Sequence, residues 1–448
     1  MTPTPTDAVT SGLTRALARI GLPAPTGLER LSGGANMESW LFTVGGARFV
    51  LRRSPGGSQL VGGRSIGLGQ EAALIRAAHA GSVLAPEIVV ELVPEDGLGA
   101  GFVMRAIVGT AEPATILDTP DADGLLREIA REMAATHRVD LSALDLPLFE
   151  NGPALDQLRE RFLGYGGDRP ILALGLSWLE RNIPPPVPPR LVHGDFRMGN
   201  LLVENGHLTG VLDWELAHLG DPHEDLAYAC MTVWRFSRPD RPALGLATVE
   251  TLAQAYREAG GETFDPVRFH FWLVYRTLWW ALGCLQMANT WRSGQDRSLE
   301  RVVVGRRLSE QELDLLMLLE DEAPEEERRR ALPPSPPPVE PGHGEPSGAE
   351  VLTAVSEWLA SDIKPLVAGR GRFDLAVARN ALGIVARELT QRPTAIDAAL
   401  AADVMAGKAN LATPGLLAGL RRRALDKLTT DMPKYPALAL ARAKWEGS

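Results

Sequence analysis

A proline-rich break in the last third of the chain most constrains what this sequence can fold into. Between Glu320 and Gly348 an acidic run is followed by three consecutive arginines and then by Pro333-Pro334-Ser335-Pro336-Pro337-Pro338. No apolar periodicity survives there, and proline cannot continue a helix or a central strand. The stretch therefore predicts an extended, solvated linker, and the 448 residues are expected to form at least two domains.

The residues before this linker change from strand-like to helical patterns. Ser39 to Val44 and Ala47 to Leu51 flank the turn dipeptide Gly45-Gly46, which predicts a β-hairpin. A helix should follow over Gln70 to Ala80, with strands near residues 87–92 and 101–107. Helices dominate later, apart from a second predicted hairpin around Asn205-Gly206. This order is typical of an α+β domain.

The residues after the linker carry a helical pattern only. Val351, Leu352, Val355, Leu359 and Ile363 recur at helical spacing. We therefore expect a small all-α C-terminal domain. No motif in it has a chemistry that can be named.

Composition excludes several classes of protein. The formal net charge of -10 argues against nucleic acid or an anionic membrane as the main partner. Cys230 and Cys284 lack a metal-ligand or disulfide pattern, which favours a reducing compartment. The apolar stretch Phe269 to Met287 carries Arg276 and is short for a membrane span, so it predicts a buried helix. Met1 to Gly12 does not resemble a signal peptide, and we expect a cytoplasmic protein.

Three polar residues lie at spacings that suit phosphoryl transfer. Asp195 and Asn200 belong to the segment Leu191-Val192-His193-Gly194-Asp195-Phe196-Arg197-Met198-Gly199-Asn200, and Asp213 follows the second predicted hairpin. One carboxylate can accept the proton of an attacking hydroxyl. An amide and a second carboxylate can hold magnesium against nucleotide phosphates, because Mg²⁺ prefers oxygen ligands.

These segments resemble the aminoglycoside phosphotransferase-like family, the choline-kinase-type branch of the protein-kinase fold. His193-Gly194-Asp195 through Asn200 resembles its catalytic loop, and Asp213-Trp214-Glu215 resembles its counterpart of the kinase D-F-G motif. Asp221-Pro222 and Asp225-Leu226-Ala227 match the stretch that follows in that family. The resemblance implies that Asp195 is the catalytic base, that Asn200 and Asp213 bind Mg²⁺, and that His193 and Asp225 give structural support.

The N-terminal part resembles the family in order and spacing. Leu31-Ser32-Gly33-Gly34-Ala35-Asn36 resembles the short glycine loop over the phosphates, and Phe49-Val50-Leu51-Arg52 takes the place of the kinase V-A-I-K strand. Arginine in place of lysine is a departure, and whether Arg52 or Arg53 reaches the phosphates stays open. By resemblance, the nucleotide-binding residues are Ser32, Gly33, Gly34, Arg52, Glu71, Met104 and Ala106.

The resemblance also implies the architecture. It covers roughly residues 28–300 and implies a bilobal protein-kinase-like fold with a β-rich N-lobe and a helical C-lobe. The expected phosphotransferase domain spans residues 24–321, with its N-lobe at about 24–107 and its C-lobe at about 108–321. A linker at 322–348 and a helical domain at 349–448 should follow.

The function that the resemblance implies is ATP- and Mg²⁺-dependent transfer of a phosphoryl group to a hydroxyl of a small molecule. No segment resembles a protein-kinase activation segment. The chain is similar to the branch associated with acyl-CoA dehydrogenases, which makes a hydroxyacyl-CoA the first expected acceptor and implies a functional link to such a dehydrogenase. The tail resembles a helical domain of unknown function that accompanies these kinases.

Other interpretations stay open. An aminoglycoside or amino-alcohol is the second candidate acceptor, although a polycation would need an acidic wall that the sequence does not locate. The chain could instead be a non-catalytic nucleotide-binding regulatory module, or it could transfer a nucleotidyl group. A metallohydrolase site from His193, Asp195, Asp213, His218 and His223 fits no zinc spacing.

Overall fold

The computed structural model describes residues 5–31, 37–54, 66–142, 144, 154–338, 344–391 and 397–447. The chain divides into two compact units. The first unit comprises Met1–Pro153 and Pro185–Trp272, and the second comprises Ala154–Pro184 and Leu273–Ser448. The chain passes from the first unit to the second within the long helix α9 (Pro266–Arg292), which confirms the helix expected there.

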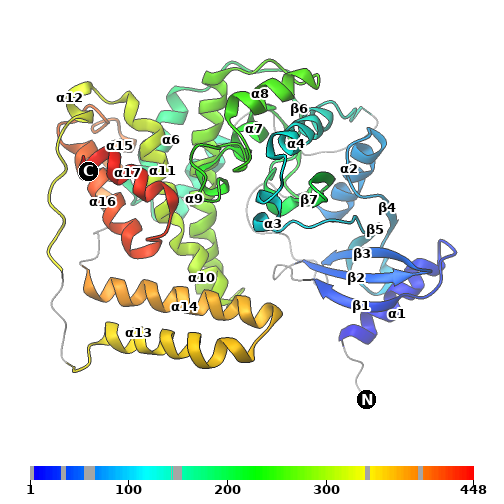
Figure 1. The fold of residues 1–448 in the computed structure, drawn as a ribbon. Coiled ribbons are helices and arrows are strands. Elements are labelled where there is room, and N and C mark those ends of the chain that lie inside the picture. The colour runs from blue at the N-terminus through cyan, green and yellow to red at the C-terminus, as the bar shows by residue number, and fades with distance from the viewer. Residues whose placement is uncertain are drawn as a thin grey trace. The chain divides into compact units, whose positions relative to one another are not determined.

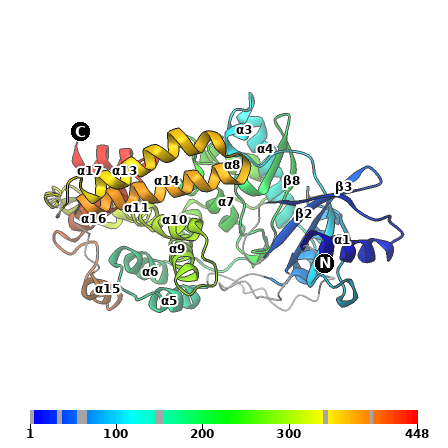
Figure 2. The ribbon, with the colours of Figure 1, turned by 90° about the horizontal axis from the view of Figure 1, so that it is seen from below.

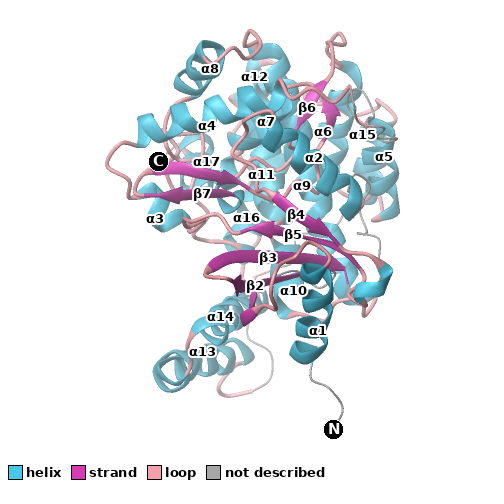
Figure 3. Cartoon of the chain, turned by 90° about the vertical axis from the view of Figure 1, so that its right-hand side faces the viewer, coloured by secondary structure: helices cyan, strands magenta, loops and turns pink. Residues whose placement is uncertain are grey.

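The first unit begins with a five-stranded antiparallel sheet in the order β1-β2-β3-β5-β4. Figure 3 shows its central strands lying side by side. The predicted hairpin is confirmed: Val44 pairs with Ala47, and Gly45 and Gly46 adopt φ values of 57° and 86° that a side chain would disfavour. The strands are β1 (Thr26–Leu31), β2 (Glu38–Val44), β3 (Ala47–Ser54), β4 (Ile88–Glu91) and β5 (Ala100–Arg105).

Two helices accompany this sheet (Figure 1). Helix α1 (Pro5–Ala18) was not predicted from the sequence, yet Val9, Leu13 and Leu17 are fully buried in one apolar cluster with the sheet. Their spacing places them on one helix face. Helix α2 (Leu68–Ala80) confirms the predicted helix and carries Glu71 on its buried side, with 1% of that residue exposed.

The rest of the first unit is mainly helical, with two short antiparallel strand pairs. The pair β7 (Leu201–Glu204) and β8 (His207–Val211) confirms the second predicted hairpin. Strand β6 (Arg190–Val192) pairs with β9 (His218–Gly220), and this pairing was not predicted. The helices are α3 (Pro113–Leu117), α4 (Ala122–His137), α7 (His223–Ala229) and α8 (Val249–Glu258), with a 3-10 turn η2 at Met198–Asn200.

The second unit consists of helices from both sides of the predicted linker. Helices α13 and α14 lie side by side in both views (Figures 1 and 2). Within the described ranges, no helix is long and apolar enough to cross a membrane. The helices are α5 (Leu155–Gly164), α6 (Pro170–Arg181), α10 (Leu299–Arg306), α11 (Leu308–Leu319), α12 (Glu325–Arg328), α13 (Gly348–Trp358), α14 (Gly369–Thr390), α15 (Ala398–Met405), α16 (Leu416–Asp431) and α17 (Pro436–Glu446).

The proline-rich segment is extended and mostly exposed, as the sequence predicts, but it is fastened at one point. The Ser335 hydroxyl donates to Asp426 of α16 at 3.0 Å. Just before it, α12 and the 3-10 turn η4 (Glu320–Glu322) interrupt the region expected to be linker. The domain limits at residues 321 and 349 therefore stay predictions.

Acidic side chains of α11 and η4 are buried against the C-terminal helices. Lys427 of α16 pairs with Glu312 at 2.5 Å, and the Tyr435 hydroxyl donates to Asp314 at 2.6 Å. Glu320 is 1% exposed, accepts hydrogen bonds from Arg421 and Trp445, and forms an ion pair with Lys444. The tail thus supplies cations for Glu312 and Glu320 and a hydrogen-bond donor for Asp314, three acids that precede the linker.

Replacing Arg421 with alanine should therefore destabilise the second unit. Arg421 is 3% exposed and donates from Nε to Glu320 at 3.0 Å. Removing one partner of a buried ion pair leaves the other charge poorly compensated. Because Lys444 still contacts Glu320, we expect the free energy of unfolding to fall by only about 3 kcal/mol. Urea unfolding measures this, with the exposed Arg442→Ala as control. Equal effects of the two substitutions would contradict the expectation.

Candidate active site

The loop that carries Asp195 leaves a short buried strand. Leu191 and Val192 are buried, and β6 pairs with β9. Gly194 follows with φ of 79°, and a Cβ atom there would lie 2.5 Å from the carbonyl oxygen of Leu216. Only glycine fits this close approach. The glycine therefore lets the chain turn sharply and present Asp195.

Three neighbours fix the carboxylate of Asp195. The Tyr228 hydroxyl donates to Oδ1 at 2.7 Å, and Asn200 Nδ2 donates to Oδ2 at 2.6 Å. Arg197 Nε lies 3.1 Å from Oδ1. Asp195 is 8% exposed, so the carboxylate is held in one orientation at the edge of the protein interior. A carboxylate so placed can orient a hydroxyl and accept its proton.

Asp225 and His193 form hydrogen bonds with the backbone of this loop and of the neighbouring segment. The backbone N–H groups of His193 and Gly194 donate to Asp225 at 2.8 and 2.9 Å, and His137 Nε2 donates to it at 3.0 Å. His193 Nε2 donates to the Leu212 carbonyl oxygen at 3.1 Å. Burial lowers the pKa of His193, so its ring is neutral and suits a structural role.

The buried Asp225 carboxylate should make stability depend on pH. Burial alone would raise its pKa, but hydrogen bonds from His137 and the backbone lower the pKa from 3.8 to about 2. Because the folded-state pKa is the lower one, this stabilisation is present above the unfolded value of 3.8 and disappears as pH falls toward 2. The shift corresponds to roughly 2 kcal/mol.

Urea unfolding from about pH 5 to about pH 2.5 tests this expectation. The free energy of unfolding of Asp225→Asn should depend less steeply on pH than that of the wild type. Parallel pH dependence of the two proteins would contradict it.

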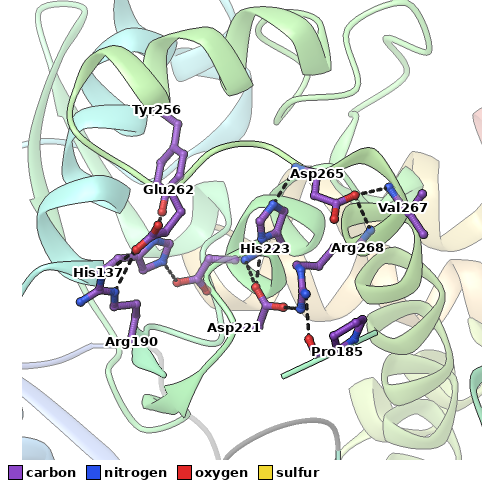
Figure 4. Close-up of polar contacts among 11 residues, drawn as sticks. His137, Pro185, Arg190, Asp221, His223, Tyr256, Glu262, Asp265, Val267 and Arg268 are labelled. Carbon is purple, nitrogen blue, oxygen red and sulfur yellow. Dashed lines mark hydrogen bonds and ion pairs between the residues drawn. The ribbon is translucent and has the colours of Figure 1, made fainter. Parts of the chain in front are cut away.

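A second polar network fixes the start of α7, the helix that carries Asp225 and Tyr228 (Figure 4). Asp221 accepts from the backbone N–H and Nδ1 of His223 at 2.9 and 3.0 Å, and from Arg268 at 2.6 Å. Arg268 also donates to the Pro185 carbonyl oxygen at 2.7 Å. Burial raises the pKa of Asp221, but these donors outweigh it and lower the pKa to about 2. Both aspartates therefore hold α7 as anions.

Asp213 and Glu71 meet at Arg52. Arg52 Nη2 lies 2.9 Å from Asp213 and 2.6 Å from Glu215, and its Nε lies 3.1 Å from Glu71. Burial would lower the pKa of Arg52, but the three carboxylates keep the pKa raised. For the Glu71 carboxyl, burial has the opposite effect: it raises the pKa to about 7, although the nearby Arg52 counteracts the shift. Arg53 instead pairs with Glu38 at 2.7 Å. The structure thus brings Arg52, not Arg53, to the candidate site.

The residues expected to bind magnesium fit that ion. The Leu212 N–H donates to the backbone carbonyl oxygen of Asn200 at 2.8 Å. Asp213 directly follows Leu212, so this backbone bond brings the segments of the two expected ligands together. Asn200 uses its amide N–H on Asp195, which leaves its amide oxygen for a metal. Asp213 has φ of 67°, an uncommon conformation for a residue with a side chain, and such strain is frequent at functional sites. Across the described ranges no three His, Cys, Asp or Glu side chains form a metal cage, but Mg²⁺ needs only one or two carboxylates plus phosphates and waters.

The remaining expected nucleotide contacts are less defined. Met104 lies in β5 between Val50 and Ile88 of the neighbouring strands. The Ala106 N–H donates to the Arg48 carbonyl oxygen at 3.0 Å, so this donor is already used within the protein. The predicted contacts Ser32, Gly33 and Gly34 lie outside the described residues.

Several residues at this site were not predicted. Tyr228, Arg197 and Glu215 contact the candidate base or Arg52, and His137 supports Asp225 from α4. Tyr228 could have been predicted, because residues three apart on a helix share a face and Tyr228 lies three residues after Asp225. His137 gave no signal, since it is far from the loop in sequence.

The fold and the site together define a kinase-like phosphotransferase. An antiparallel sheet precedes a helical part in one unit, and a loop aspartate contacts an asparagine whose backbone bonds to the residue before a second aspartate. Residues 27–270, more than half of the chain, match the model of the phosphotransferase enzyme family. The chain belongs to this family of phosphotransferases. Residues 365–435 match a domain of unknown function, DUF6285.

Two curated relatives match about half of this chain. Acyl-CoA dehydrogenase family member 10 of Mus musculus is 26% identical over 257 residues, 52% of this chain and 24% of that protein. Acyl-CoA dehydrogenase family member 11 of Gallus gallus is 28% identical over 214 residues, 45% of this chain and 27% of that protein. The chain thus spans about a quarter of the length of these relatives.

A solved structure supports the fold. The protein comes from Ralstonia eutropha and is named as a candidate aminoglycoside phosphotransferase. It has a TM-score of 0.56 and 20% sequence identity, and the match covers 70% of this chain and 98% of that chain. At this identity the likeness confirms the kinase-like fold and nothing further.

Proposed function

We propose that this protein transfers the γ-phosphate of ATP to a hydroxyl group of a small molecule, with Mg²⁺ as cofactor. The observation that carries the proposal is the carboxylate of Asp195, held by Asn200 and Tyr228. In this role Asp195 orients the acceptor hydroxyl toward the phosphate and accepts its proton. The attacking oxygen then forms the new bond to phosphorus while ADP leaves.

Asn200 and Asp213 would hold the magnesium ion. Bound there, Mg²⁺ would neutralise charge on the nucleotide phosphates. Arg52, kept in place by Glu71, would direct its guanidinium to the same phosphates, exchanging its contacts with Asp213 and Glu215 for phosphate oxygens. Ser32, Gly33 and Gly34 would cover the phosphates, and Met104 and Ala106 would border the adenine.

For the acceptor we propose a hydroxyacyl-CoA. The support is the sequence similarity to proteins named as acyl-CoA dehydrogenase family members. A functional link to an acyl-CoA dehydrogenase belongs to the same proposal. We further propose that the phosphotransferase domain spans residues 24–321 and that the helical domain spans 349–448.

Product analysis tests the proposed reaction. The protein is incubated with ATP and Mg²⁺ and a panel of 3- and 4-hydroxyacyl-CoAs and aminoglycosides, with Asp195→Asn as control. ADP that depends on one acceptor and disappears in the variant is the expected result. Unchanged ATP with every acceptor would favour a regulatory module, and pyrophosphate would indicate nucleotidyl transfer.

A further inference from the structure

Three arginines gather in the segment that follows α7. Arg235, Arg238 and Arg241 are half-buried, and none forms an ion pair with a carboxylate anywhere in the described part of the chain. The acid within this stretch is Asp240, which is exposed. Half-buried cations without an anionic partner are costly unless something else compensates them.

Backbone carbonyls hold these arginines in place without neutralising them. A guanidinium has five N–H donors, and each of the three uses only one or two of them on carbonyl oxygens. The charge and the remaining donors stay available for an anion. Arg235 donates to Cys230 (3.2 and 3.1 Å), Arg238 to Leu117 and Gly245 (3.0 and 3.4 Å), and Arg241 to Leu246 (2.8 Å).

The same segment has an unusual backbone. Phe236, Ser237 and Leu244 have φ values of 46°, 67° and 54°, although each carries a side chain. A Cβ atom at Gly245 would lie 2.9 Å from the Arg235 carbonyl oxygen. Left-handed residues of this kind persist where surrounding contacts impose them, often at ligand sites. The segment is therefore held in one strained shape that fixes the arginines.

Two series of contacts between neighbouring residues connect this segment to the loop that carries Asp195. Tyr228, which donates to Asp195, packs against Trp234 with ring centroids 5.9 Å apart, and Arg235 follows directly. Arg197 also lies over the Trp234 ring, 5.5 Å from its centroid. On the other side, Arg238 bonds to the last residue of α3, and α3 packs beside η2, which contains Asn200.

We infer that Arg235, Arg238 and Arg241 form a binding site for the anionic part of a phosphate-bearing acceptor. This inference rests on the proposed phosphotransferase function and specifies its substrate class. Guanidinium groups match phosphate oxygens in charge and in bidentate geometry. A polycationic acceptor would meet repulsion at this segment. The acceptor hydroxyl then reaches Asp195 while its phosphates are held beyond Trp234.

Coenzyme A and pantetheine provide the test, because pantetheine lacks the phosphates. Calorimetry measures both dissociation constants with AMP-PNP and Mg²⁺ saturating the nucleotide site. We expect coenzyme A to bind about tenfold or more tightly than pantetheine, and each Arg→Gln substitution at 235, 238 or 241 to weaken coenzyme A binding by about tenfold. Pantetheine binding should not change. Arg127→Gln, at an exposed arginine 3.6 Å from Glu258, is the matched control.

The outcomes separate the site from the reaction. Equal binding of coenzyme A and pantetheine by the wild type would overturn the inference, as would coenzyme A binding that does not weaken with salt. Weaker AMP-PNP binding in the arginine variants would show that these arginines bind the nucleotide, and this result would also overturn the inference. If a glutamine variant fails to fold, Arg→Lys at the same position keeps the charge and should retain the preference for coenzyme A. Arginine-dependent coenzyme A binding without ADP formation would sustain this site while refuting the proposed reaction.

Discussion

Asp195→Asn is expected to lower kcat for phosphoryl transfer by about a thousandfold, within the range for loss of a general base. The amide that replaces the carboxylate cannot accept the hydroxyl proton. It keeps nearly the same shape, and its oxygen can still accept from Tyr228 or Asn200. The effect should therefore fall on the chemical step and leave ATP affinity almost unchanged.

Single-turnover ADP formation and a separate ATP-binding measurement distinguish these two effects. Asp123→Asn removes an exposed carboxylate of α4 in the same unit and serves as the control. A variant with wild-type kcat would rule out Asp195 as the base. A variant that loses ATP binding to the same extent as kcat would indicate structural damage instead.

Asp225→Ala is expected to destabilise the first unit by about 5 kcal/mol, since three buried donors would lose their acceptor together. The donors are the N–H groups of His193 and Gly194 and the ring of His137. Each unsatisfied buried donor costs about 1–3 kcal/mol. Activity should be lost as well, because the loop that presents Asp195 would no longer be held.

Urea unfolding measures the stability, and Asp225→Asn is the informative companion. Asparagine keeps one acceptor oxygen, so its loss of stability should lie between those of wild type and alanine. Asp140→Ala is the control, because Asp140 is exposed and accepts only the N–H of Ser142. This substitution should lower the free energy of unfolding much less than Asp225→Ala. Equal losses for Asp225→Ala and Asp140→Ala would refute the structural role of Asp225.

The sequence predicts the core of the fold because the relevant signals are local. The glycine pair at 45–46, the Asn205-Gly206 turn and the periodicity of Gln70–Ala80 each act over a few residues, and the structure confirms all three elements. The loop around Asp195 and Asn200 is likewise one short segment. The structure brings these two side chains together, with Asn200 Nδ2 2.6 Å from Asp195 Oδ2.

What the sequence did not predict depends on contacts between distant residues. His137 and Asp225 are 88 positions apart, and Arg52 and Glu215 are 163 apart, so no periodicity connects them. The choice between Arg52 and Arg53 was open for the same reason. Adjacent strand residues point to opposite faces, and only the fold decides which face meets Glu71. Helix α1 was missed because a Thr/Pro-rich start obscured the spacing of Val9 and Leu13.

The acids buried on α11 and η4 have a consequence for how this protein can be divided. A tail joined by a proline-rich segment invites treatment as a removable module. Yet Glu312, Asp314 and Glu320 find their partners in Lys427, Tyr435 and Arg421, beyond that segment. A shortened chain that ends before the tail would turn these acids into exposed or unpaired charges on its own surface. A chain without this tail would therefore need uncharged residues at these positions of α11 and η4.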